Sequence, residues 1–222
     1  MAQAGGIVVV GSINADLTAR VARHPSPGET LIGSGGEITP GGKGANQALA
    51  AALQGAAVSF VGAVGDDPQA EAATALLREG GVDLSRVATV SGPTGLAIIT
   101  VDDAGENSII VVPGANADVY EALVDKHRAA IEEAAVVLLQ GEIPPAASAA
   151  AARAARGRVV LNLAPVVELD AETVRAADPL VVNEHEAALA AGILGGEAPE
   201  GEPGQVTRGC VECGGTDIHI RR

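Results

Sequence analysis

Short apolar runs alternate with helix-forming stretches along most of this 222-residue sequence. The apolar runs are rich in β-branched residues and are bounded by turn formers, which is typical of buried strands. Several of the stretches between them open with Asn, Asp or Pro, which are common at helix N-termini. We expect strands at 7–10, 58–64, 136–139, 159–161 and 180–182, and helices at about 48–53, 69–79, 116–133, 144–156, 171–176 and 184–191. Repeated strand–helix units predict an α/β fold, with a parallel sheet covered by helices.

Four strand-like pieces do not fit this alternation. Residues 17–21 and 30–38 flank a turn-rich segment, and residues 96–101 and 108–112 flank 102–107, where Asp, Gly and Asn are typical of a turn. We expect these pieces, at about 17–38 and 96–112, to form a small separate sheet. Such a sheet is a candidate lid over a binding site.

A glycine-rich stretch, Gly41 to Gln47, precedes a run of strong helix formers. Three glycines in four positions are unfavourable inside a helix, so we expect a loop that leads into a helix N-terminus. Free N–H groups at such an end favour anions and polar oxygens, and Lys43 and Asn46 could face the same ligand. The stretch is not a Walker A loop, because Glu37 and Gly44 stand where that motif needs Gly and Ser or Thr. A bare turn without a ligand is the alternative interpretation.

Polar residues recur where the predicted strands end. In an α/β sheet, ligands bind beyond the carboxyl ends of the strands, which makes such residues candidates for a shared site. Any single one could instead be a helix cap or a surface loop residue. The residues are Asn14, Asp16, Glu142, Asn162, Asn183 and Glu186.

Composition excludes several classes of function. The formal net charge of −14 leaves no general basic surface for nucleic acid or an anionic membrane. No apolar stretch is long enough to span a bilayer, and the N-terminus lacks the basic region of a signal peptide. Two cysteines, Cys210 and Cys213, give no disulfide framework, so we expect a reducing, cytoplasmic location.

The amino-acid composition changes after about residue 194. Residues 195–204 are rich in Gly, Pro and Glu and resemble a linker, and both cysteines follow them. A zinc site formed by Cys210, Cys213 and His219 is one alternative, although three ligands fall short of the four that structural zinc usually has. We expect 195–222 to be a linker-like tail.

Several segments together carry a family pattern over about residues 6–192: 11–17, 41–48, 65–67, 94–97, 105–107, 113–117 and 162–165. In this order and spacing they resemble the ribokinase-like sugar kinases, also called the phosphofructokinase-B family. The Gly41–Ala48 loop with Asn14-Ala15-Asp16 favours members that act on ribose over fructose or nucleoside kinases. The resemblance implies a three-layer α/β/α fold with a mostly parallel sheet and a small β-sheet lid. It also implies transfer of the ATP γ-phosphoryl group to O5 of D-ribose, with Mg²⁺ and an activating monovalent cation such as K⁺.

The resemblance also implies roles for individual residues. Sugar contacts are implied for Asn14, Ala15, Asp16, Gly42, Lys43, Gly44, Ala45, Asn46 and Glu142. Asn183 would contact the nucleotide phosphates of ATP, and Glu186, which with it matches an Asn-x-x-Glu motif, would serve Mg²⁺. The lid is implied to form a homodimer.

One departure from the family pattern is large. Family members continue for about another hundred residues, roughly half a typical α/β domain. That part carries a Gly-Ala-Gly-Asp motif, with the catalytic base and the groups that stabilise the transferred phosphoryl, together with most of the adenine pocket and the K⁺ site. The sequence contains no such motif, and Gly214–Asp217 is only a superficial echo. We therefore expect a partial domain at 1–194 that lacks the C-terminal part of the fold, holds no catalytic base and is inactive alone.

Three hypotheses follow from these observations. The chain derives from a ribose kinase, or it is a non-catalytic sugar-binding or dimerising fragment, or it belongs to another carbohydrate or nucleoside kinase of the same family. Turnover with ribose and Mg-ATP would separate the first two, and binding of ribose, 2-deoxyribose and adenosine would test the third.

Overall fold

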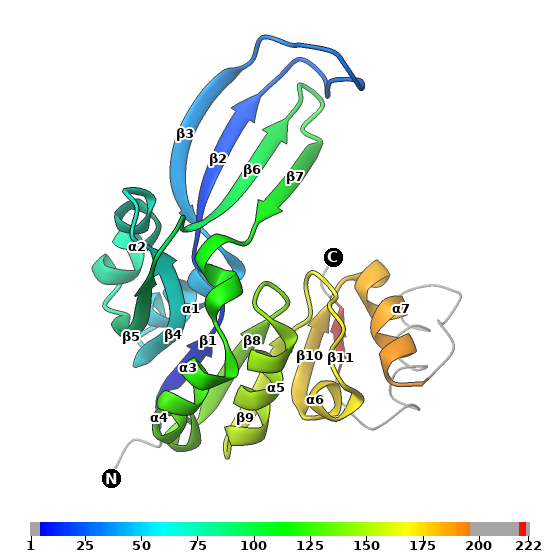
Figure 1. The fold of residues 1–222 in the computed structure, drawn as a ribbon. Coiled ribbons are helices and arrows are strands. Elements are labelled where there is room, and N and C mark those ends of the chain that lie inside the picture. The colour runs from blue at the N-terminus through cyan, green and yellow to red at the C-terminus, as the bar shows by residue number, and fades with distance from the viewer. Residues whose placement is uncertain (1–4, 196–217, 221–222) are drawn as a thin grey trace.

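The computed structural model describes residues 5–195 and 218–220. Within these residues the larger sheet has the order β11-β10-β9-β8-β1-β4-β5, and every neighbouring pair is parallel (Figure 1). Its strands are β1 (Ile7–Val10), β4 (Val58–Gly65), β5 (Asp83–Val90), β8 (Val136–Gln140), β9 (Arg158–Asn162), β10 (Ala177–Val182) and β11 (Ile218–Ile220). The predicted parallel α/β sheet is confirmed.

Helices cover both faces of this sheet. They are α1 (Lys43–Leu53), α2 (Gln69–Glu79), α3 (Glu121–Lys126), α4 (Arg128–Glu133), α5 (Pro145–Ala154), α6 (Ala171–Arg175) and α7 (Glu184–Ile193). Successive side chains of a strand point to opposite faces, and β1 accordingly divides its valines between two cores. Val9 packs with α1 and α2, whereas Val8 and Val10 pack in the cluster that includes residues of α3 to α7. The result is a three-layer α/β/α arrangement.

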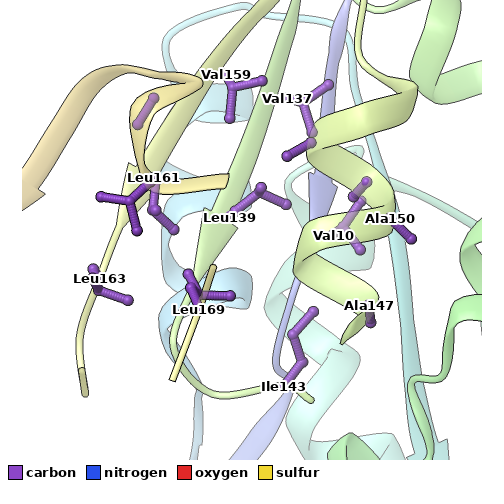
Figure 2. Packing of buried hydrophobic residues seen from close by; sticks show 14 of the residues in the cluster. Val10, Val137, Leu139, Ile143, Ala147, Ala150, Val159, Leu161, Leu163 and Leu169 are labelled. Carbon is purple, nitrogen blue, oxygen red and sulfur yellow. The ribbon is translucent and has the colours of Figure 1, made fainter. Parts of the chain in front are cut away.

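The larger core consists of aliphatic side chains of modest size. Figure 2 shows Ala147 and Ala150 of α5 against Val10 and Leu139 of the sheet. Alanines at this helix surface let its backbone approach the strands closely, so Val and Leu fill the space without aromatic residues. This packing explains how a chain with 1% aromatic residues forms a dense core.

A second, four-stranded sheet stands apart from the first (Figure 1, top). We call it the small sheet; its order is β3-β2-β6-β7, formed by β2 (Asn14–Arg20), β3 (Ser34–Gly41), β6 (Gly95–Val101) and β7 (Asn107–Val112). The β2–β6 pair is parallel, and the other two pairs are antiparallel. The prediction of a small separate sheet is therefore confirmed.

Several local predictions differ from the structure. Asn14 and Asp16 belong to β2, not to a loop after β1, and α1 already begins at Lys43. Strand β5 was not predicted, and the helix expected at 116–133 is divided into a 3₁₀ turn (Gly114–Asp118), α3 and α4. Of the predicted tail, only 195 and 218–220 are described, and 218–220 pairs with β10, which sequence reasoning did not anticipate.

Two further sequence predictions concern membranes and the tail. Across 5–195 and 218–220, no helix combines the length and apolarity that crossing a bilayer requires. The proposed zinc ligands Cys210 and Cys213 lie outside the described residues, as does the side chain of His219.

Candidate functional site

A cavity of about 110 Å³ lies where the small sheet meets the carboxyl edge of the large one. Strand register explains its lining. Asn14 and Asp16 alternate along β2 and so share one face, and Asp16 pairs with Ala97 of β6, which pairs with Val111 of β7. The full lining is Asn14, Asp16, Gly42, Lys43, Asn46, Ala97, Ile99, Ile109, Val111 and Glu142.

The turn between β3 and α1 consists of a single residue. Gly42 has φ +91°, a conformation that side chains other than glycine disfavour, and an added Cβ would lie 2.9 Å from Asn14 N and Ser12 O. The predicted glycine loop is therefore shorter than expected, because Gly41 ends β3 and Gly44 lies in the first helical turn. Glycine is needed at position 44 in spite of its low helix propensity, because an added Cβ would lie 2.7 Å from Ser12 N.

The first N–H groups of α1 are occupied by the protein itself. Lys43 N–H donates to Glu142 Oε2 at 2.9 Å, Gly44 N–H donates to Ser12 Oγ at 3.2 Å, and Ala45 N–H donates to Ser12 O at 3.0 Å. The expectation of free N–H groups at this helix end was wrong. The anion that the helix N-terminus attracts is the carboxylate of Glu142.

Glu142 is thereby fixed from two sides. Its Oε2 also accepts from the Ser12 hydroxyl, and its Oε1 lies 3.3 Å from Lys43 Nζ. The Glu142 side chain is 7% exposed and that of Lys43 is 38% exposed. The carboxylate is thus held rigidly, whereas the ammonium can still reach a ligand in the cavity.

Asp16 carries the least satisfied charge of the cavity. Its Oδ1 is buried without a hydrogen-bond partner among the described residues. Burial raises the pKa of the Asp16 carboxyl, repulsion from Glu142 raises it further, and attraction to Lys43 opposes both. An added Cβ at Gly41 would lie 2.1 Å from this carboxylate, so glycine at that position makes room for it. A buried acceptor of this kind is suited to a hydroxyl donor.

Asn14 is oriented by a residue that sequence reasoning did not select. The Nδ2 of Asn116 donates to Asn14 Oδ1 at 2.7 Å and to Ile13 O at 3.2 Å, and its Oδ1 accepts from Ile13 N–H at 2.9 Å. Both asparagines are buried. Because Asn14 Oδ1 is already engaged by Asn116, its Nδ2 is the group left to donate.

The structure brings six of the nine predicted sugar contacts together: Asn14, Asp16, Gly42, Lys43, Asn46 and Glu142. Ala15, Gly44 and Ala45 do not line the cavity. The side chains of Ala15 and Ala45 lie in the core beside α1, and Gly44 is buried against Ser12.

Asn183 and Glu186 lie elsewhere, at the N-terminus of α7. They form a capping box, in which Asn183 Oδ1 accepts from Glu186 N–H at 2.8 Å and Glu186 Oε2 accepts from Asn183 N–H at 2.7 Å. Their geometry accounts for the start of this helix. Among the described residues, no group of three or more His, Cys, Asp or Glu side chains gathers in one place.

Sequence reasoning also missed Ser12 and the apolar lining of the cavity. Ala97, Ile99, Ile109 and Val111 face Asp16 from β6 and β7. The alternation of these residues was visible, but only the strand register shows which side of the small sheet faces the cavity. The site therefore has a polar wall and an apolar wall.

Comparison with known proteins places this geometry in context. Residues 5–203 match the model of the pfkB family of carbohydrate kinases. The chain is 39% identical over 191 residues to the ribokinase of Haemophilus influenzae, covering 84% of this chain and 62% of that protein. It is 40% identical over 184 residues to the ribokinase of Lactococcus lactis, covering 81% of this chain and 61% of the relative. The chain thus spans about three fifths of the length of these curated relatives.

The fold is also similar to that of a solved structure. The ribokinase of Arabidopsis thaliana complexed with ribose and ATP superposes with a TM-score of 0.82 at 32% identity, covering 97% of this chain and 70% of that one. The 97% of this chain that is covered includes strands of both sheets.

Proposed function

This chain belongs to the pfkB family of carbohydrate kinases, and we propose that its cavity is the sugar-binding half of a site that phosphorylates D-ribose at its 5-hydroxyl with ATP. The observation that carries the proposal is the cavity itself, in which Asn14, Asp16 and Lys43 face one small space together with Glu142. At about 110 Å³ it lies well below the roughly 300–1,000 Å³ of sites for drug-sized ligands, which favours a small sugar.

The two walls of the cavity fit the two faces of a pentose. Asp16 offers a buried acceptor without a partner in the described residues, and Lys43 offers a donor, so adjacent hydroxyl groups can be bound from the polar side. Ile99 and Ile109 offer apolar contact to the C–H face of the ring. Gly42, Asn46 and Glu142 complete the proposed contacts at the start of α1.

Ala15, Gly44 and Ala45 remain in the proposal as indirect contacts. Their packing against Ser12 and the core fixes the backbone that carries Asp16 and Lys43. A loose turn would not hold these two groups at one distance.

The phosphate side of the reaction is proposed at the N-terminus of α7. The positive end of this ten-residue helix favours phosphate, and we assign the phosphate contact to Asn183, its N-cap residue. Mg²⁺ usually keeps several waters and binds through one or two carboxylates, so the single carboxylate of Glu186 fits such an ion. When bound, Mg²⁺ would neutralise charge on the transferred phosphoryl group. We assign no residue of 5–195 to a monovalent cation such as K⁺ or to the catalytic base.

We further propose that the small sheet acts as a lid and forms a homodimer. Its edge strand β7 exposes Ile109 and Ile110 at 52% and 63%, and Ile38 of the opposite edge is 46% exposed. Apolar edge strands readily pair with a second copy. The formal net charge of −14 favours binding to neither nucleic acid nor an anionic membrane. We propose a cytoplasmic location, which would supply ATP and keep Cys210 and Cys213 reduced.

Calorimetric titration of the chain with D-ribose, 2-deoxyribose and adenosine tests the proposal. We expect ribose to bind, deoxyribose to bind more weakly and adenosine not to bind. Asp16→Ala should abolish ribose binding, whereas Asp103→Ala, which removes an exposed acid of the lid turn, should leave it unchanged. Preferential binding of adenosine would favour a nucleoside kinase instead.

A coupled ADP-release assay with ribose and Mg-ATP separates a half-site from a complete enzyme. We expect no turnover by this chain, because it contains no Gly-Ala-Gly-Asp motif. Turnover at the roughly 1–100 s⁻¹ typical of kinases would contradict the half-site proposal.

A further inference from the structure

Three amide side chains connect the start of α1 with the carboxyl ends of three strands. Gln140 Nε2 donates to Gln47 Oε1 at 2.8 Å, and Gln47 Nε2 donates to Asn162 Oδ1 at 3.2 Å. Asn162 Nδ2 then donates to Val181 O at 3.0 Å. These side chains come from β8, α1 and β9, and the final carbonyl belongs to β10.

The donor-to-acceptor direction of this series of hydrogen bonds is determined at one end. The Val181 carbonyl can only accept, so Asn162 must present Nδ2 to it and Oδ1 to Gln47. Gln47 must then donate Nε2 to Asn162, which leaves its Oε1 to accept from Gln140. One obligatory acceptor therefore sets the orientation of all three amides. Rotation of Gln47 or Asn162 would break two hydrogen bonds, and rotation of Gln140 would break one.

The other end is confined by glycines. Gln140 is 1% exposed, and its Oε1 has no hydrogen-bond partner in the part of the chain that the structure describes. An added Cβ would lie 2.0 Å from this oxygen at Gly11 and 2.9 Å from it at Gly44. The backbone directly after β1 and the first turn of α1 thus pack against the Gln140 amide, which prevents it from turning away.

The two ends of this hydrogen-bonded series lie beside the two groups of residues to which the proposed function assigns separate roles. Gln47 directly follows Asn46, and Gln140 lies two residues before Glu142, both in the cavity lining. Val181 lies two residues before Asn183 at the N-terminus of α7. We propose that Gln140, Gln47 and Asn162 form a positioning relay, which holds the sugar-binding cavity and the α7 N-terminus in a fixed relation and transmits sugar binding from one to the other. The meaning of the two ends rests on the proposed function.

Gln47→Met tests the relay, because methionine has a similar volume and cannot replace either hydrogen bond. The matched control is Gln54→Ala, which changes an exposed glutamine at the opposite end of α1. Hydrogen exchange is followed at the N–H groups of Asn183 and Glu186, both of which are hydrogen-bonded in the capping box. Without sugar, we expect Gln47→Met to accelerate exchange at these two groups by about tenfold, as loss of roughly one hydrogen bond predicts. Exchange in α2 should not change.

Addition of D-ribose gives the second readout. In the wild-type chain, ribose should slow exchange at Asn183 and Glu186. In Gln47→Met, ribose should still bind, with a Kd raised by about threefold to tenfold, but this remote protection should disappear. Asn162→Ala interrupts the relay without altering α1 and should have the same remote effect.

The outcomes separate the relay from the proposed function. If wild-type protein binds no ribose, the proposed function fails, and the exchange rates without sugar still decide on the relay. A uniform rise in exchange across all helices would indicate general destabilisation and would overturn the relay. Unchanged remote protection in both variants would overturn it as well.

Discussion

Replacing Glu142 by alanine should destabilise the folded chain by about 3 kcal/mol, whereas glutamine should cost about 1 kcal/mol or less. The difference arises from what each replacement leaves without a partner. Glu142 Oε2 accepts from the Ser12 hydroxyl and from Lys43 N–H at 2.9 Å, and its Oε1 lies 3.3 Å from Lys43 Nζ. Alanine removes the acceptor of both donors.

The magnitude follows from burial. Ser12 is fully buried and the Glu142 side chain is 7% exposed, so each donor that loses its acceptor costs about 1–3 kcal/mol. The Lys43 side chain is 38% exposed, so its ammonium regains water and adds little. Glutamine keeps an oxygen in the position that serves both donors and loses only the ion pair. It also removes the repulsion between Glu142 and Asp16.

Urea denaturation of wild-type, Glu142→Gln and Glu142→Ala measures this difference directly. Ser12→Ala should resemble Glu142→Ala in cost, because it leaves Gly44 N–H without its acceptor. Equal destabilisation by glutamine and alanine would refute the reasoning, because the ion pair would then dominate the hydrogen bonds.

Three further predictions follow. Burial and repulsion from Glu142 raise the pKa of Asp16 above 3.8, so its ionised form destabilises the free protein. The melting temperature of Asp16→Asn should therefore match that of wild type well below pH 3.8, exceed it increasingly as the pH rises from 3.8 to the raised pKa, and keep a constant advantage above that pKa. Gly42→Ala and Gly36→Ala both introduce a side chain at φ +91°, but only the first meets backbone within 4 Å, so denaturation should show a cost of about 1–2 kcal/mol for Gly36→Ala and clearly more for Gly42→Ala. Burial opposes the ionised form of Asp67, but hydrogen bonds from Thr94 and from Ala70 N–H outweigh it and lower the pKa of Asp67. Asp67→Ala should therefore lower the free energy of unfolding by about 1–3 kcal/mol at neutral pH. In acid denaturation this loss should shrink as the pH drops through the lowered pKa.

The central strands could be predicted because they are buried on both faces. Runs such as 7–10 and 58–64 are almost continuously apolar, and no helix of that length would be stable between glycines. Strand β5 escaped prediction because it lies at the edge of the sheet, where Asp83 and Arg86 interrupt an apolar pattern that is only half buried. Edge strands carry a weaker signal for this reason.

The candidate site was predicted in part for a similar reason. The residues that line the polar wall lie in short motifs, so Asn14, Asp16 and Lys43 could be selected from the sequence. The apolar wall depends on pairing between β2 and β6, which are separated by about eighty residues of chain, and local patterns carry no information on that register. Ser12 was missed because its hydroxyl donates to Glu142, which lies just after β8 and 130 residues away along the chain.

The occupation of the α1 N-terminus by Glu142 was also beyond sequence reasoning. A helix end of this type usually indicates an external anion, and nothing in 41–47 shows that the chain supplies its own. The correction changes the expected role of this end, since it positions a carboxylate for the cavity and leaves the ligand to the side chains.

A crystal structure of the chain grown with D-ribose tests the central claim most directly. The account predicts one sugar between β2 and β6 on one side and the start of α1 on the other, with hydroxyl groups within hydrogen-bond distance of Asp16 Oδ1 and Lys43 Nζ. Ribose bound elsewhere, or an empty cavity at a sugar concentration that saturates the calorimetric signal, would contradict it.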